Sequence, residues 1–285
     1  MTRSVLLSLF IILAVAFSAV AVDASVSSSV VFGATTPSFG SATQSASNPK
    51  ADDVADRNIL VQSTITLNSS VTGGESITGI NVIPETPFIA TDLNIVLKTT
   101  TPVTIANTGT GILFEARIPE KLDAVDAALA PKAFKVAKVE LKNGATTVGS
   151  FDVYMQRENN LVVEDIDVQV TGIAGTSDSK SLDPDDVDDL KDIRPGDQLD
   201  ITVNLENKFN SRDNIAVEDI DVSVRIEGND FDDDDSEDLG DLSEDDQDSV
   251  TIALEVDDDA DKQSAGMFIT ASGRDENGAL HGDAA

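Results

Sequence analysis

Alternation of apolar and polar residues with a period of two is the main pattern of the chain. It is clearest in the second half, at residues 166–170, 199–205, 220–226 and 250–256, where Ile, Val and Leu alternate with mainly polar side chains. A period of two places successive side chains on opposite faces of a strand. Each segment is therefore predicted to be a strand with one buried and one solvated face.

The first half contains similar segments. Residues 59–67, 112–118 and 147–156 are predicted to be strands, separated by turns that contain Gly or Pro. In a further apolar segment around residue 137 the apolar residues shift from one parity to the other. A β-bulge near Ala137-Lys138 would account for this shift.

One segment has a helical pattern instead. Within residues 119–130, the apolar residues at helical spacing are Leu122, Val125, Ala128 and Leu129, and Pro131 follows as a stop signal. The sequence therefore predicts a short helical crossover here.

The segment Val-Glu-Asp-Ile-Asp-Val occurs twice, at residues 163–168 and 217–222. The intervening sequence contains no third copy. The repeat is therefore interpreted as two similar strands of one sandwich rather than as a solenoid period.

Strand pattern and length together predict the fold class. The 285 residues are about twice the length of a usual domain. We expect an all-β chain with two tandem Ig-like β-sandwich domains after a signal peptide and a flexible linker. The predicted boundaries are a signal peptide at 1–24, a Ser/Ala/Thr-rich linker at 25–57, a first sandwich at 58–160, an acidic Ig-like second sandwich at 161–275 and a tail at 276–285.

The N-terminus has the features of a secretory signal peptide. Arg3 precedes an apolar run at residues 5–22 that ends in small residues. This run is near the lower length limit for spanning a bilayer, so cleavage is favoured over the alternative of a retained membrane anchor. No transmembrane helix is predicted after cleavage, and the protein is predicted to be secreted to the cell surface. For residues 25–57, a plain linker is favoured over a glycosylated stalk.

The chain carries 52 acidic and 19 basic residues, a formal net charge of −33. This charge repels nucleic acids and anionic lipid surfaces, so neither is predicted as a partner. The chain has no Cys, which excludes disulfides, Cys-ligated metal sites and thiol catalysis.

About 32 of the acidic residues fall between positions 178 and 261. Crowded carboxylates are ligands for Ca²⁺. Asp230, Asp232 and Asp234 have the spacing of the first EF-hand ligands, but Asp235 occupies the position where that loop needs Gly. Solvated acidic loops are therefore favoured over a Ca²⁺ site, and no metal ligand is assigned.

Residues for catalysis are scarce. The only His is His281, in the predicted tail, so a Ser-His-Asp triad is not predicted. A glycosidase-like carboxylate pair stays open, although sugar sites favour Trp and Tyr, and Tyr154 is the only such residue. The chain is predicted not to be an enzyme. Asn68, followed by Ser69-Ser70, is predicted to be an N-glycosylation site exposed in a loop.

Several features of the chain together resemble archaeal surface-layer proteins with CARDB-like, Ig-like adhesion modules. They are the signal peptide, the strand at residues 161–170, the Asp-Ile-Arg-Pro-Gly-Asp-Gln segment at 192–198, the strand at 199–207 and the acidic strands after Asn214. The resemblance covers about residues 160–275. It implies a role in the cell envelope and no catalytic residues.

Two functions from different classes follow. The first is a structural or adhesive surface protein whose partners are other copies of itself or other envelope proteins. The alternative is a calcium-dependent ligand- or glycan-binding surface module, in which acidic loops of the second sandwich hold ions. A secreted hydrolase is a third class and would need carboxylates that converge in a cleft.

Overall fold

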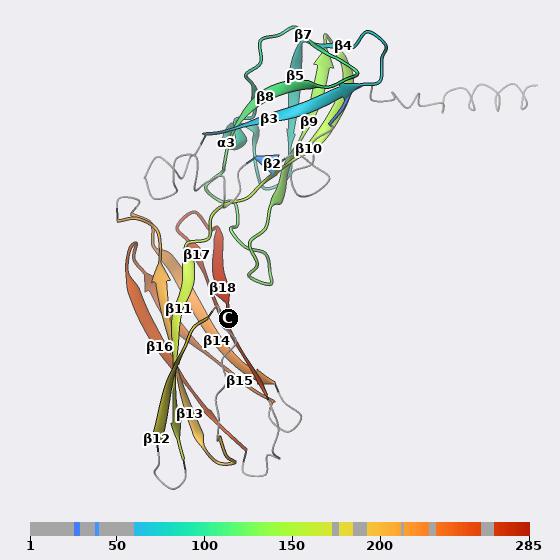
Figure 1. Ribbon diagram of the computed structural model, residues 1–285. Helices are drawn as coiled ribbons and strands as arrows, with labels where there is room; N and C mark the ends of the chain where they lie inside the picture. The colour runs from blue at the N-terminus through green and yellow to red at the C-terminus, as the bar shows by residue number, and fades with distance from the viewer. Residues whose placement is uncertain are drawn as a thin grey trace, which may run out of the picture.

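The protein is almost entirely β-structure (Figure 1). The computed structural model describes residues 26–28, 38–39, 60–172, 177–184, 193–211, 214–227, 232–257 and 265–285. Nearly all strand pairs are antiparallel, and the one helix in this part of the chain, α3 (Ala90–Leu93), has four residues. The all-β prediction is therefore confirmed. The predicted signal peptide at 1–24 lies outside the described residues.

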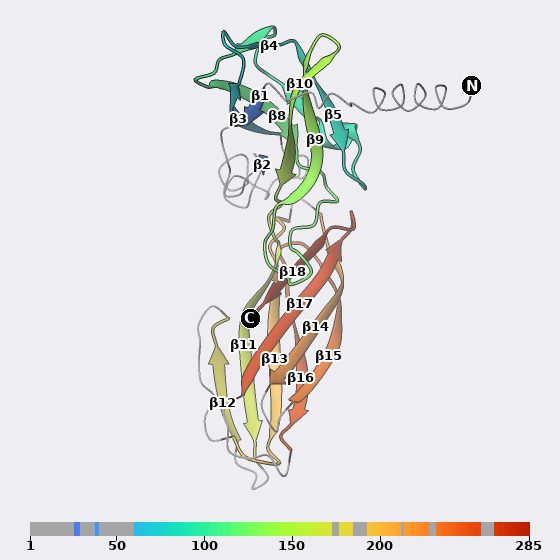
Figure 2. The same cartoon turned by 90° about the vertical axis from the view of Figure 1, so that its right-hand side faces the viewer.

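The strands form two parts, each around its own hydrophobic core. We call residues 26–28, 38–39 and 60–160 the N-terminal part and residues 161–285 the C-terminal part. Figures 1 and 2 show that the two parts lie end to end, so that the molecule is elongated.

An eight-stranded sheet surrounds the core of the N-terminal part. Its strand order is β5-β9-β10-β1-β3-β8-β6, and β2 also pairs with β10. Phe114 of β8 and Phe151 of β10 meet edge to face at 5.5 Å, so the two halves of the sheet face each other across the core. The strands are β1 (Val26–Ser28), β2 (Ser38–Phe39), β3 (Leu60–Ser69), β5 (Gly79–Pro84), β6 (Val96–Leu97), β8 (Thr110–Arg117), β9 (Phe134–Asn143) and β10 (Thr146–Met155), with a separate pair of β4 (Glu75–Ile77) and β7 (Val103–Ile105).

The C-terminal part is a sandwich of two four-stranded antiparallel sheets, ordered β12-β11-β13-β16 and β15-β14-β17-β18. The chain crosses from one sheet to the other three times, between β13 and β14, between β15 and β16, and between β16 and β17. This connection pattern is consistent with an immunoglobulin-like sandwich. The strands are β11 (Leu161–Thr171), β12 (Ser177–Leu182), β13 (Gln198–Asn207), β14 (Val217–Glu227), β15 (Asp232–Leu242), β16 (Gln247–Glu255), β17 (Gly266–Asp275) and β18 (Leu280–Ala284).

The predicted alternation explains this sandwich. In β13, Leu199, Ile201, Val203 and Leu205 are buried, whereas the residues between them reach the surface. The repeated segments at 163–168 and 217–222 form parts of β11 and β14, inner strands of opposite sheets. The interpretation as two strands of one sandwich is therefore confirmed.

The predicted bulge is present in β9. Val153 pairs with Ala137 and Tyr154 with Lys135, so Val136 is the extra residue. Val136 and Ala137 are both buried, which explains the shift of apolar parity.

The predicted helix at residues 119–130 is wrong, because this segment is a loop of turns between β8 and β9. The carboxylate of Asp126 accepts hydrogen bonds from the backbone N–H groups of Ala128 (2.9 Å) and Ala130 (3.3 Å). These bonds, and a left-handed backbone at Leu129 (φ 59°), stabilise a turn in place of a helix. Leu122 and Val125 are nevertheless buried and Leu129 is partly buried, which accounts for the misleading pattern.

Two predicted boundaries also need correction. The predicted linker at 25–57 contains β1, which pairs with β3 and β10, and β2, which pairs with β10. The predicted tail at 276–285 contains β18, which forms a hairpin with β17. These strands are defined by backbone pairing rather than by a side-chain pattern, because each of them is too short to show a clear alternation.

Candidate functional site at the junction of the two parts

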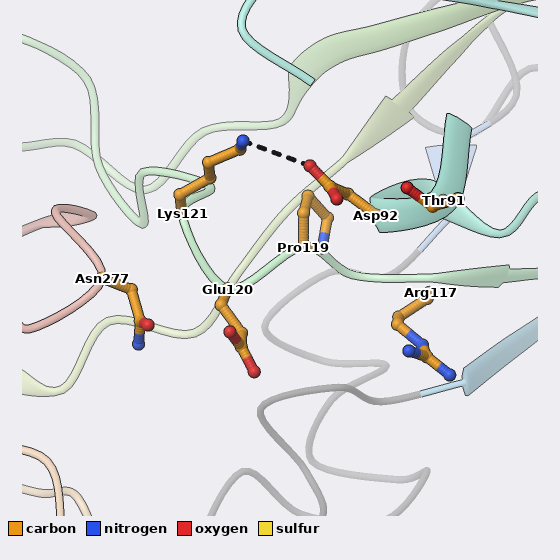
Figure 3. A pocket seen from close by; sticks show the side chains of 7 residues that line it. All are labelled: Thr91, Asp92, Arg117, Pro119, Glu120, Lys121 and Asn277. Carbon is orange, nitrogen blue, oxygen red and sulfur yellow. Dashed lines mark ion pairs between the residues drawn. The ribbon is translucent and has the colours of Figure 1, made fainter. Parts of the chain in front are cut away.

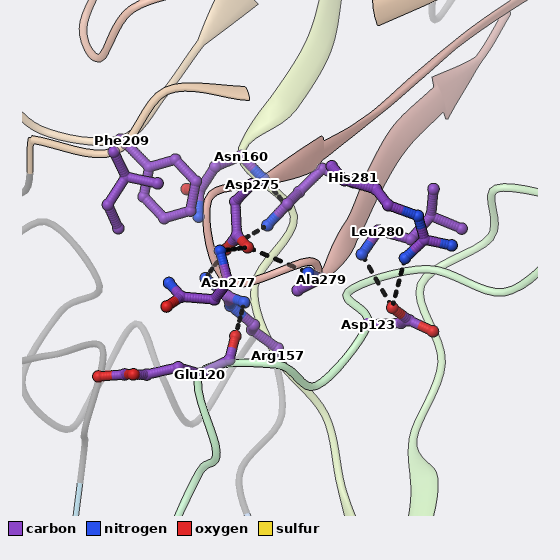
Figure 4. Close-up of polar contacts among 12 residues, drawn as sticks. Glu120, Asp123, Arg157, Asn160, Phe209, Asp275, Asn277, Ala279, Leu280 and His281 are labelled. Atoms are coloured by element: carbon purple, nitrogen blue, oxygen red, sulfur yellow. Dashed lines mark hydrogen bonds and ion pairs between the residues drawn. The ribbon is translucent and has the colours of Figure 1, made fainter. Parts of the chain in front are cut away.

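The loop between β8 and β9 joins the two parts. It extends from the N-terminal part to the β17–β18 hairpin, where the N–H of Ala124 donates to the carbonyl of Leu280 (2.9 Å). The N–H of Leu280 in turn donates to Asp123 Oδ1 (2.8 Å) (Figure 4). An alanine Cβ at Gly282 would lie 2.6 Å from the carbonyl oxygen of Ala271 and 2.9 Å from Leu129 of the loop. The loop and β18 are therefore in close contact.

A buried ion pair lies at the centre of this junction. Arg157, in the segment between β10 and β11, donates from Nη2 to Asp275 Oδ2 (2.6 Å), and its Nη1 donates to the carbonyl of Glu120 (Figure 4). Asp275 Oδ1 accepts hydrogen bonds from the N–H groups of Asn277 (2.9 Å) and Ala279 (3.0 Å). Both charged side chains are buried. One ion pair therefore connects the loop, the segment between the parts and the last hairpin.

Burial would raise the pKa of Asp275, but its neighbours have the larger combined effect. Contact with His281, the positive charge of Arg157 and the hydrogen bond from Ala279 together lower the pKa of Asp275 to about 2. The carboxylate is therefore ionised at neutral pH and forms a true ion pair with Arg157.

His281 completes the buried cluster. Its Nδ1 accepts a hydrogen bond from the backbone N–H of Asn160 (3.1 Å), which places the proton of the neutral imidazole on Nε2. Nε2 lies 3.6 Å from Asp275 Oδ2, too far for a hydrogen bond. The ring of Phe209 meets the imidazole edge to face at 5.2 Å, and Arg157 lies 5.7 Å from the centre of the Phe209 ring.

Burial lowers the pKa of His281 to about 4, and the charge of Arg157 acts in the same direction against the opposing effect of Asp275. His281 is neutral at pH 7 and has no exposed surface. A substrate could not reach this imidazole. The cluster of Arg157, Asp275 and His281 therefore has the properties of a structural connection rather than of a catalytic site.

Further hydrogen bonds attach β18 to the start of β11. The amide of Asn159 donates to the carbonyl of Gly282 (3.0 Å) and accepts from its N–H (3.1 Å). Asp283 accepts a hydrogen bond from the N–H of Val163 (3.1 Å). The junction is therefore held by several hydrogen bonds in addition to the ion pair.

A cavity of about 270 Å³ lies beside this cluster (Figure 3). Lys121 and Asp92 form an ion pair across it (3.1 Å). Arg117 Nε and Asn277 Nδ2 are buried and have no acceptor within the described part of the chain. The cavity could accept a small molecule with hydrogen-bond acceptors. Its lining consists of Thr91, Asp92, Arg117, Pro119, Glu120, Lys121 and Asn277.

The structure places the residues predicted from sequence away from this junction. Asn68 is the penultimate residue of β3 and half-buried, with its backbone beside Ser27 of β1, so it does not lie in the exposed loop that was expected. Glycosylation of Asn68 stays a prediction. Asp232 and Asp234 belong to strand β15 rather than to a loop, and Asp230 is outside the described residues. Across the described ranges, no group of three or more His, Asp or Glu side chains is arranged to hold a metal ion.

The junction cluster itself was not predicted. Its residues are far apart in sequence, 118 positions for Arg157 and Asp275, and a single charged residue leaves no periodic signal. One usable signal was present, because Asn277-Gly278 is a strong hairpin dipeptide that predicts a strand after it.

No protein-family model matches the chain, and a search of curated proteins finds no similar sequence. Within the residues that the structure describes, no helix has the length and apolar character needed to cross a membrane.

Proposed function

We propose that the chain is a secreted structural or adhesive protein of the cell surface, without catalytic activity. The observation that carries this proposal is the bonded junction, in which Arg157 connects three segments of the chain through Asp275 and Glu120. Two β-rich parts fixed end to end form a stiff spacer, and stiffness is what a structural or adhesive protein needs to hold contacts at a set distance.

The surface of the C-terminal part supports the same role. Residues 161–285 contain 38 acidic and eight basic residues, a net charge of −30. Acidic side chains line exposed edges, as in β15, and keep the sandwich soluble and separate from other anionic surfaces. The resemblance to CARDB-like modules of archaeal surface-layer proteins adds that the partners are other copies of the chain or other envelope proteins.

Surface location is tested by labelling intact cells of the source organism with antibodies against the C-terminal part. We expect labelling without permeabilisation, whereas an antibody against a cytoplasmic protein should label only permeabilised cells. Labelling by both antibodies only after permeabilisation would show that the proposal is wrong.

Ion dependence separates this function from the calcium-dependent alternative. In β14 and β15, Asp221 and Asp238 are directly paired, so like charges face each other. Any salt that screens this repulsion should raise the melting temperature. We therefore expect NaCl, MgCl₂ and CaCl₂ at equal ionic strength to give equal shifts in thermal unfolding of the secreted chain. A larger shift with millimolar CaCl₂, reversed by EDTA, would favour the alternative.

A further inference from the structure

Arg117 is the last residue of strand β8, and its side chain faces away from the hydrophobic core. Ile112, Phe114 and Ala116 of the same strand are buried, so the alternation of the strand places Arg117 on its outer face. There it is half-buried and lines the cavity at the junction of the two parts. Partial burial of a charged guanidinium costs free energy unless an opposite charge or a hydrogen-bond acceptor compensates it.

The described part of the chain supplies no such partner. The side chain of Arg117 forms no ion pair or hydrogen bond there, and its Nε is buried. Nine other basic side chains in the described ranges form ion pairs. Lys138 and Arg194 also form none, but both are exposed. Because the chain has 52 acidic residues and 19 basic ones, an unpaired guanidinium at a cavity indicates a ligand that supplies the negative charge.

The other charged residues of the cavity limit the charge of this ligand. Lys121 and Asp92 compensate each other in their ion pair. In the view of Figure 3, Glu120 lies between Arg117 and Asn277. The two acidic side chains would repel a ligand with several negative charges. A single carboxylate matches the one uncompensated guanidinium, which can bind it through two parallel hydrogen bonds.

The remaining polar groups suit a ligand with hydroxyl groups. The carboxylates of Asp92 and Glu120 can accept hydrogen bonds from hydroxyls, whereas the Thr91 hydroxyl and Nδ2 of Asn277 can donate to them. Nδ2 of Asn277 is buried and has no acceptor within the described residues. The volume of about 270 Å³ is slightly below the range of about 300–1,000 Å³ that is usual for drug-sized ligands. The cavity therefore fits one small polar molecule.

We propose that this cavity binds a small polyhydroxylated monocarboxylate, a sugar acid, with its carboxylate paired to Arg117. Six of the seven lining residues belong to the N-terminal part, whereas Asn277 belongs to the turn between β17 and β18. The ligand would therefore contact both parts of the molecule beside the buried ion pair. Residues 60–160 contain ten acidic and eight basic residues, a net charge of −2, so this side of the cavity repels an anion only weakly.

Two sources have this chemistry, a free sugar acid and a sugar-acid unit of a glycan. The inference is separate from the proposed function, which specifies no small ligand. The test is calorimetric titration of the secreted chain with sodium glucuronate at constant ionic strength. We expect saturable binding of one glucuronate, and none of glucose, which lacks the carboxylate. An oligosaccharide that ends in glucuronate should bind more tightly than the free acid if the source is a glycan, and no more tightly if it is the free acid.

Variants locate the site. Arg117→Gln should weaken glucuronate binding about 10- to 100-fold, the range expected for the loss of hydrogen bonds to a charged group. Arg194→Gln is the matched control, because it removes the same charge from an exposed side chain of the C-terminal part and should leave binding unchanged. Asn277→Ala should weaken binding about two- to tenfold, as the loss of one neutral hydrogen bond does.

Folding is checked separately from binding. Because the side chain of Arg117 has no partner among the described residues, Arg117→Gln should keep the melting temperature of the unliganded chain. The inference is overturned if glucuronate does not bind saturably, if glucose binds equally well, or if Arg117→Gln binds glucuronate like the unchanged chain. Displacement of glucuronate by a lower concentration of inorganic phosphate would assign the site to a multiply charged anion and would also overturn it. Surface labelling decides the proposed function independently of all these outcomes.

Discussion

Replacing Arg157 with Met should lower the free energy of unfolding by about 3–5 kcal/mol, the usual result of removing one partner from a buried ion pair. The Asp275 carboxylate would remain buried with no opposite charge beside it. The loop carbonyl of Glu120 would lose the hydrogen bond from the guanidinium. We expect this single change to weaken the junction more than any exposed ion pair could.

Urea unfolding followed by circular dichroism measures this effect, and the fluorescence of Tyr154, the only Tyr, reports on the N-terminal part. Lys98→Met is the matched control, because it removes a basic residue from the exposed ion pair with Glu115, where the expected loss is about 0–1 kcal/mol. Equal losses for Arg157→Met and Lys98→Met would contradict the structural role of the buried pair.

The double variant Arg157→Met/Asp275→Leu tests the same idea in the opposite direction. It removes both charges, so that no ionised group is left buried without a partner. Part of the lost stability should return, because an apolar pair can replace a buried ion pair at low energetic cost. The N–H groups of Asn277 and Ala279, which lose the Asp275 acceptor, limit the recovery.

The sequence predicts the strands of the C-terminal part well because burial on one face leaves a direct trace. Every second residue of β13 is buried, and the alternation of Leu, Ile and Val with polar residues follows from that. The bulge at Val136 is visible for the same reason, since an extra residue moves the apolar series to the other parity. Patterns fixed by local burial are thus readable in one sequence.

The loop at 119–130 shows where this reasoning fails. Leu122 and Val125 are buried by contact with other segments, and the spacing of the apolar residues matches a helix only by coincidence. The decisive local interaction is the turn formed by the Asp126 carboxylate, a competing effect that hydrophobic periodicity does not represent.

The candidate site is less predictable still. Arg157, Asp275 and His281 act together only because the N-terminal loop, the connecting segment and the last hairpin meet. Acidic clusters such as residues 232–235 are the more prominent feature of the sequence, yet they belong to the edge strand β15. The abundance of acidic residues therefore identifies the solvated surface, whereas the contacts of the junction depend on single residues.

Acid should weaken the junction before most carboxylates titrate, because of His281. In the folded chain the pKa of His281 is about 4, below the ordinary value of 6.5. Between these two pH values the unfolded chain binds a proton that the folded chain does not, so the free energy of unfolding falls as the pH falls. The full difference corresponds to about 3 kcal/mol, reached near pH 4.

The main physical reason is burial, which disfavours the charged imidazolium, and the hydrogen bond at Nδ1 acts in the same direction. Protonation would place a hydrogen on Nδ1, facing the N–H of Asn160, so two donors would oppose each other. Asp275 acts in the same direction at lower pH: its pKa of about 2 is below the ordinary value of 3.8, so its contribution is lost as the pH falls from about 4 to 2.

The measurement is the difference between the unchanged chain and His281→Asn at pH 7, 5.5 and 4.5, because protonation of the many exposed carboxyl groups changes the stability of both chains alike. Asn offers a side-chain oxygen to the Asn160 N–H but does not titrate, so the unchanged chain should lose stability faster as the pH falls. Since His281 is the only His, its imidazole NMR signal gives the pKa directly. A midpoint near 6.5 in the folded chain, or parallel pH profiles for the two proteins, would show that the imidazole is not held neutral at the junction.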